Sequence, residues 1–513
     1  METLADSSWD VIIAGTGLAE SLLALALSRS GKKVLHVDKN PYYGGTEAAF
    51  SLDEAQQWMD GVNQRPGQSP FEDVSIVTPH DAPDPSQTDR PKLSPSRSYT
   101  LSLSPYFLYT RSLLISTLIS SKVYRQLDFM AVGSWWIYTS EENGTLTGAA
   151  RVLQRVPGNR EDVFADTRIS MKSKRSLMRF LRHISKPADE EDLAPEAEDL
   201  SMPFEEYLAS KFSVPADLHN PLQSLSLSQL AQPETSASYA VPRVKRHLAS
   251  IGALGPGFGA VISKYGGGSE ILQVACRASA VGGAVYALDT GIQSVEDSDA
   301  EEHPVKVQLS TGESVQTRSV VGAIWDLPSQ KQSESSGIKV ARSITIVSAI
   351  FESLFPVTVE GAPFPANAVL MFPGSTLDSP QSPPVYLQIH SSDTGDCPRQ
   401  QSIIYGSVAQ PGPDGQSLLD SAVARLLQAE GPQATVLWSL RYSQLGRLSN
   451  GDIPPTLSEH SPHVHSFPPP NLDLAFEDET VGVVKEAWQK IMGNEARSDE
   501  FMIFDDRDGA SDD

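Results

Sequence analysis

The chain has 513 residues, enough for at least two domains, because single hydrophobic cores rarely grow beyond about 250–300 residues. Its 40 basic and 64 acidic side chains give a formal charge of −24, which argues against a nucleic-acid surface, where phosphates require clustered Lys and Arg. Cys276 and Cys397 are too few for a disulfide framework or a thiolate metal site. The amino terminus does not resemble a signal peptide, and no apolar run reaches the roughly 20 residues of a membrane span, so we expect a cytoplasmic protein.

The first predicted elements are a strand, a glycine turn, a helix and a second strand. A β-branched run leads into Gly15 and Gly17, and an apolar periodic segment follows at residues 18–30, with Gly31 as the predicted stop signal of the helix. The second strand, residues 33–38, ends in Asp38, about 20 residues beyond the glycine turn. This βαβ unit is typical of an α/β fold of the Rossmann type, which binds FAD or NAD(P).

An acidic residue interrupts the dinucleotide pattern of this turn. In G-x-G-x-x-G the third glycine lets the helix pack against the strand, while the pyrophosphate meets the helix N-terminus. Glu20 stands at that third position, where its carboxylate would repel a phosphate. We therefore interpret Gly15, Gly17, Glu20 and Asp38 as the remnant of a cofactor site and expect no cofactor. The alternative from another class is an FAD-dependent oxidoreductase.

The rest of the chain divides by composition. Residues 63–97, rich in Pro, Ser, Gln and Asp, are predicted to be a disordered insertion. Apolar residues at helix spacing predict a helical domain over 105–236. Strand-like patterns then return, so 1–104 and 237–493 are predicted to form one discontinuous α/β domain with mixed sheets. The acidic tail, 494–513, is predicted to be disordered.

Two blocks of sequence resemble the family of Rab GDP-dissociation inhibitors and Rab escort proteins. Residues 9–45, which include GTGLAES and SGKKVLHVDKNPYYGG, are similar to the family's first conserved block. Residues 264–286, which begin KYGGGSE, are similar to a second block. The segment REDVF at 160–164 and the long insertions favour the escort branch, of the fungal type. A Rab GDP-dissociation inhibitor is the nearer alternative.

The resemblance implies a platform domain with the FAD/NAD(P)-binding fold, a smaller all-helical domain that shelters lipid, and no enzymatic activity. It also implies that the chain binds GDP-loaded Rab GTPases and presents them to a separate Rab geranylgeranyltransferase heterodimer. The prenylated Rab, with its geranylgeranyl lipid, would then be delivered by transient contact with a membrane.

The resemblance also assigns a Rab-binding surface residue by residue. It places this surface at Tyr43, Glu270, Arg277, Val285 and Ala287. Tyr and Arg suit an interface anchor, because each offers a large contact area with a polar end. The competing interpretation is that all five residues serve local packing. The sequence contains no Ser/His/Asp, paired-carboxylate or metal-ligand constellation that indicates catalysis.

Overall fold

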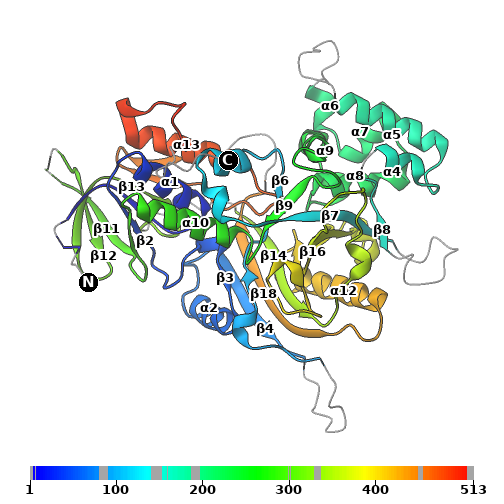
Figure 1. The fold of residues 1–513 in the computed structure, drawn as a ribbon, viewed down its shortest axis with the longest axis horizontal. Helices are drawn as coiled ribbons and strands as arrows, with labels where there is room; N and C mark the ends of the chain where they lie inside the picture. The colour runs from blue at the N-terminus through cyan, green and yellow to red at the C-terminus, as the bar shows by residue number, and fades with distance from the viewer. Residues whose placement is uncertain are drawn as a thin grey trace, which may run out of the picture.

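Two large sheets lie next to each other, and a lobe of helices lies at the end of the molecule far from the first sheet (Figure 1). This architecture is seen in a computed structural model. The structure describes residues 4–5, 7–79, 91–139, 153–158, 160–185, 197–298, 300, 302–328, 337–448 and 455–504. The predicted α/β fold with mixed sheets and a smaller helical part is confirmed.

The first sheet is built around the predicted βαβ unit, which consists of β1 (Ser8–Ala14), α1 (Leu18–Arg29) and β2 (Val34–Val37). Strands β1 and β2 pair in parallel, and β1 pairs in parallel with β13 on its other side. The strand order is β10-β2-β1-β13-β12-β11, with β20 also beside β13 and β19 beside β20. The bounds are β10 Val285–Ala287, β11 Ile292–Asp297, β12 Val305–Leu309, β13 Ser314–Ala323, β19 Ser458–Ser461 and β20 Val464–Phe467.

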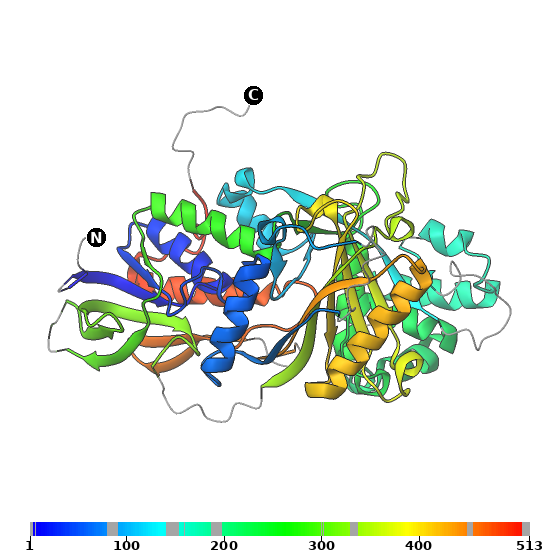
Figure 2. The ribbon, with the colours of Figure 1, turned by 90° about the horizontal axis from the view of Figure 1, so that it is seen from below.

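Three helices cover one face of this sheet: α1, α10 (Gly268–Val281) and α13 (Glu479–Met492) (Figure 2). Helix α1 packs against both α10 and α13. This explains why its sequence is apolar on nearly every side, since a helix with no solvent face needs no polar stripe. It ends at the predicted stop signal, Gly31, whose φ is +80°.

The second sheet has the order β4-β18-β14-β17-β16-β15-β7-β9-β6, with β8 beside β7. Its two faces are covered by different layers. In β15 (Asn367–Phe372), Val369 and Met371 pack into the core shared with the helical lobe, whereas Ala368 and Leu370 pack into the core shared with α12 (Gly412–Glu430). This alternation is the period of two that a strand buried on both faces requires. The other bounds are β4 Phe71–Val77, β6 Leu108–Tyr109, β7 Phe129–Tyr138, β8 Leu153–Arg155, β9 Ala260–Ser263, β14 Ile338–Val347, β16 Val385–Ser391, β17 Ser402–Val408 and β18 Val436–Gly446.

The helical lobe packs around aromatic side chains, among them Phe180, Tyr207 and Phe212. Its helices are α4 Arg160–Ala165, α5 Met171–Ile184, α6 Ala197–Ser201, α7 Phe204–Phe212, α8 His219–Ser226 and α9 Ala237–Ser250. Smaller elements elsewhere are β3 Ala49–Phe50, α2 Leu52–Gln64, β5 Leu101–Ser102, α3 Leu113–Ser120 and α11 Gly374–Leu377. Among the described residues, no helix has the length and apolar character needed to cross a bilayer.

The predicted insertion at 63–97 is wrong for the parts that the structure describes. Helix α2 runs to Gln64, and β4 pairs with β18 at the edge of the second sheet. Phe71 and Val74 are buried in the core there. The polar composition around β4 concealed a short strand whose order depends on a distant partner. Residues 80–90 lie outside the described residues.

The predicted all-helical range 105–236 is also wrong in its first part. Strands β6, β7 and β8 lie in it, and β7 is a ten-residue strand in the second sheet. Its sequence, FMAVGSWWIY, is rich in the aromatic residues that favour strands. The contiguous helices of the lobe instead begin at Arg160 and end at Ser250.

The predicted disordered tail is ordered over residues 494–504. Phe501 lies with its ring centroid 5.6 Å from that of Trp488 on α13, and Met502 is buried. Apolar residues within an acidic composition thus anchor the segment. The remainder of the tail, residues 505–513, lies outside the described residues.

Candidate functional site

The predicted glycine turn lies between β1 and α1, and it has almost no space for a side chain at either glycine. Gly15 has a φ of +93°, and a Cβ at this position would lie 2.7 Å from Oδ2 of Asp326. Gly17 caps α1, and a Cβ there would lie 2.8 Å from Oε2 of Glu20. Both glycines therefore serve the turn whether or not a ligand binds.

Two carboxyl groups, rather than one, occupy the start of α1. Glu20 is only 4% exposed, and burial, with a smaller contribution from the nearby carboxyl of Glu47, raises its pKa to about 8. Glu47 belongs to the short helix Gly45–Glu47, and its Oε2 would lie 3.4 Å from a Cβ at Gly17. Burial raises the pKa of Glu47 to about 7, although the hydroxyl of Thr46 and backbone amides partly offset this. Two buried carboxyl side chains thus fill the position where a helix N-terminus would receive an anion.

Asp38, the predicted ribose-binding acid, is already engaged by the protein. It accepts hydrogen bonds from Thr16 Oγ1 at 2.6 Å and from the backbone N–H of Asn40 at 2.7 Å. Burial and the neighbouring Asp326 raise its pKa. Lys39 lies beside this cluster and pairs with Asp326 at 3.2 Å.

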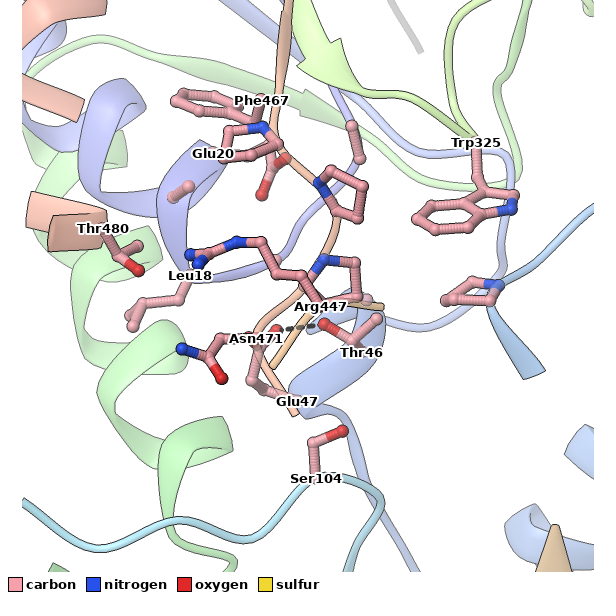
Figure 3. Close-up of a pocket in the computed structure, with 18 of the residues that line it drawn as sticks. Leu18, Glu20, Thr46, Glu47, Ser104, Trp325, Arg447, Phe467, Asn471 and Thr480 are labelled. Carbon is pink, nitrogen blue, oxygen red and sulfur yellow. Dashed lines mark hydrogen bonds between the residues drawn. The ribbon is translucent and has the colours of Figure 1, made fainter. Parts of the chain in front are cut away.

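A cavity of about 140 Å³ adjoins the helix start, between the two sheets. Figure 3 shows Arg447, Phe467, Asn471 and Thr480 around it, together with Glu20 and Glu47. Arg447 is bound in two places to the carboxylate of Glu477. The cavity is smaller than the roughly 300–1,000 Å³ of sites that hold drug-sized ligands. A dinucleotide does not fit these residues, because its pyrophosphate would meet two carboxyl groups.

The second predicted group of residues lies on the exposed side of α10. Arg277 Nη2 donates a hydrogen bond to Glu270 Oε1 at 3.1 Å, two helical turns earlier. The Arg277 side chain is 53% exposed and that of Glu270 is 27% exposed. This ion pair can therefore be reached by a protein partner.

Tyr43 is half-buried and connects α1 to the strand that follows α10. Its hydroxyl shares a hydrogen bond of 2.7 Å with Ser21 Oγ on α1. Its ring meets that of Tyr286 edge-on, with the centroids 6.0 Å apart. Burial raises the pKa of Tyr43 well above its usual value. Packing is thus part of the role of Tyr43, as the competing interpretation requires.

Val285 and Ala287 flank Tyr286 on β10, the edge strand of the first sheet, where they pair with Leu35 and Val37 of β2. Val285 is exposed and Ala287 half-buried. The structure brings Tyr43 close to β10, and it places Glu270 and Arg277 together on the preceding helix. Among the described residues, no hydrogen bond or ring contact joins Tyr43 directly to that ion pair.

Sequence reasoning missed Glu47, Ser21 and Tyr286. Glu47 follows the Gly44-Gly45 pair, and no motif indicates that this turn folds back onto α1. Ser21 stands next to Glu20, and Tyr286 lies inside the second matched block, but no pattern in the sequence indicates what either side chain contacts.

The apolar residues at helix spacing in the predicted lipid-sheltering range, 105–236, do not pack into one core. Leu114 and Leu118 pack into the core beside the first sheet, whereas Phe180 packs into the core of the helical lobe. Leu113 and Ile119 are exposed on α3.

Comparisons of the sequence with known proteins agree on one family. The family described as GDP dissociation inhibitor matches residues 5–77 and 79–354. The chain is 28% identical over 411 residues to the Rab proteins geranylgeranyltransferase component A of Candida albicans, covering 78% of this chain and 59% of that protein. It is also 28% identical over 431 residues to the protein of the same description from Saccharomyces cerevisiae, covering 82% and 64%. The chain thus spans about three-fifths of the length of these relatives.

Among solved structures, the Rab GDI of Plasmodium falciparum superposes with a TM-score of 0.64. The two proteins are 19% identical, and the match covers 95% of this chain and 99% of the other. This likeness establishes the shared fold.

Proposed function

Because the chain belongs to the GDP dissociation inhibitor family, we propose that it works as a Rab escort protein. It binds a GDP-loaded Rab GTPase, presents it to a separate Rab geranylgeranyltransferase and carries the prenylated product to a membrane. The chain itself is the accessory component and contributes no catalytic residue.

The exposed ion pair on α10 is the observation that best supports a protein partner. Glu270 and Arg277 form an ion pair, and both side chains remain accessible to solvent. A partner that covers them would therefore not bury an unpaired charge. Tyr43, Val285 and Ala287 add contact area on the neighbouring segments. The acid-filled start of α1 removes the competing use of this fold, since a flavin pyrophosphate has no site there.

The proposed mechanism is one of positioning. By holding the GTPase, the chain raises the effective concentration of its flexible tail at the active site of the transferase. The transferase supplies the chemistry, and the helical lobe shelters the attached lipid. Transient membrane contact follows when the loaded complex delivers its cargo.

A Rab GDP-dissociation inhibitor is the second candidate, since the same family contains both kinds of protein. The yeast relatives described as component A of a Rab geranylgeranyltransferase favour the escort role. A reconstituted prenylation assay distinguishes the two. With purified transferase, lipid donor and unprenylated GDP-loaded Rab, prenylation should require this chain. Equal modification without the chain would contradict the escort role.

The oxidoreductase alternative is tested by the visible absorption spectrum of the purified protein. We expect no flavin bands, because Glu20 and Glu47 occupy the pyrophosphate position. Stoichiometric bound flavin would overturn the proposal.

A further inference from the structure

The turn that precedes α10 has an unusual backbone. Tyr265, Gly266 and Gly267 follow one another with positive φ values of +61°, +99° and +61°. Glycine adopts this left-handed region freely, but a residue with a Cβ is strained there, and bulky side chains are uncommon in it. The chain therefore retains a tyrosine at a position where a third glycine would fold more easily.

The core does not account for this tyrosine. Tyr265 is 52% exposed, so burial of the residue does not compensate the backbone strain. Exposed aromatic residues in strained positions concentrate at functional sites, where the surrounding structure holds them in place.

A turn from the second sheet holds Tyr265 in its position. The backbone N–H of Tyr265 donates to the carbonyl of Thr394 at 3.0 Å. Its ring lies so close to Gly395 that a Cβ there would come within 2.5 Å of Cδ1 and Cε1. The N–H of Gly266 donates to Oδ1 of the buried Asp396 at 2.8 Å. The absence of a side chain at residue 395 is thus what leaves room for the ring.

We propose that Tyr265 is a further anchor of the partner-binding surface and that the Thr394–Asp396 turn positions it. This inference rests on the proposed function, because the partner is the GTPase that α10 is proposed to bind. Tyr265 precedes Glu270 by five residues, so their Cα atoms are at most about 18 Å apart. A standard interface buries roughly 800 Å² on each partner, which is a patch wide enough to include both residues.

Tyr265→Gly tests this role, because glycine relieves the strain while it removes the ring. The melting temperature should stay equal or rise, since the left-handed backbone suits glycine. The affinity for a purified, GDP-loaded Rab GTPase of Saccharomyces cerevisiae, measured by titration calorimetry, should fall about tenfold or more. Tyr265→Asn, which also tolerates this backbone, should behave alike and guards against an effect peculiar to glycine.

Gly395→Ala tests the positioning turn. Its Cβ displaces the ring of Tyr265, so the affinity should fall in the natural chain, and the φ of +81° at residue 395 means that alanine there also lowers the melting temperature. In the Tyr265→Gly background, where no ring remains to be displaced, Gly395→Ala should cause no further loss of affinity. Gln400→Gly is the matched control for Tyr265→Gly. Gln400 is also exposed and has a positive φ (+67°), and its replacement by glycine should leave the affinity unchanged.

The outcomes separate this inference from the proposed function. If the natural chain binds the GTPase and Tyr265→Gly binds it equally well, Tyr265 is no anchor, although the escort role stands. If Tyr265→Gly and Tyr265→Asn lose affinity only together with a large fall in melting temperature, the role of Tyr265 is structural and the inference is wrong. If the natural chain does not bind the GTPase, both proposals fail.

Discussion

Helices α1 and α10 both begin with a glycine turn and a Glu, but this Glu is buried in α1 and partly exposed in α10. Each follows a strand and a glycine turn, and each carries Glu as its third residue, Glu20 in α1 and Glu270 in α10. Glu20 is buried beside Glu47, whereas Glu270 is partly exposed and pairs with Arg277. Both helix starts share a glycine turn and the Glu, but the neighbours that pack against the two Glu side chains differ.

The comparison shows how one local motif supports two roles. A carboxyl at a helix start is favourable because it faces the positive end of the helix dipole. At α1 the turn that carries Glu47 covers this position, and the motif becomes part of the core. At α10 the position stays open, and the acid forms a charged surface with Arg277. The first helix is thus closed to a cofactor, while the second is available to a partner.

The largest effect that tests this comparison is the pH dependence that Glu20 confers on stability. Folding raises its pKa from 4.5 to about 8, so the folded chain binds this proton more tightly than the unfolded chain. Its contribution to the free energy of unfolding is therefore fully present below pH 4.5 and is lost as the pH rises to about 8. Glu20→Gln cannot ionise, so at pH 9 it should be more stable than the natural chain by about 3–5 kcal/mol, since each pKa unit corresponds to about 1.4 kcal/mol.

Urea unfolding at pH 5, 7 and 9 measures this difference. Some pH dependence should persist in the variant, because Glu47 and Asp38 also have raised pKa values. Glu270→Gln makes the same substitution at the same helical position of α10 and should change stability by no more than about 1 kcal/mol at each pH, as befits an exposed ion pair. Parallel pH profiles for Glu20→Gln and the natural chain would show that Glu20 is not the buried acid described above.

The second effect concerns the open helix. Arg277→Ala should weaken binding of a GDP-loaded Rab GTPase by about 2 kcal/mol, roughly thirtyfold, because an interface arginine combines contact area with charge. The free energy of unfolding should change by less than about 1 kcal/mol. Calorimetric titration and urea unfolding give the two quantities.

Arg318→Ala is the control for that substitution. Arg318 lies on β13, its side chain is 48% exposed, and its Nη1 lies 3.6 Å from Oδ1 of Asp10 on β1. It should leave the affinity unchanged. If both variants bind like the natural chain, the partner surface lies elsewhere on the molecule.

The sequence predicted those parts of the fold that depend on local patterns. The β1-α1-β2 unit was predicted because its periodicity, its glycines and its helix stop at Gly31 all lie within one short segment. Strand β4 and the ordered segment 494–504 were missed because distant residues stabilise them, β18 in one case and Trp488 in the other. Composition reflects how polar a segment is, and it does not reveal which remote surface will bury its few apolar residues.

The candidate site shows the same limit. Glu20 was identified from its place in a known pattern, and the structure adds that it is buried. Glu47 has no such pattern, because its contact with α1 depends on how the Gly44-Gly45 turn folds back. Tyr43, Glu270 and Arg277 came from the resemblance, and their role in binding a partner stays a prediction.

The smallest effect tests whether the closed helix supports the open surface. Ser21 is fully buried on α1 and cannot touch a partner, yet it shares a hydrogen bond with Tyr43. Tyr43→Phe and Ser21→Ala each remove this bond, which should cost about 1 kcal/mol of stability, and Ser21→Ala costs more because Ser21 Oγ also donates to the carbonyl of Thr16 at 3.2 Å. If α1 positions Tyr43 for the partner, both variants should also weaken binding a few-fold, and the double variant should lose no more than either single one. Unchanged affinity for Ser21→Ala would mean that the hydrogen bond serves packing alone, and that the two helices act independently.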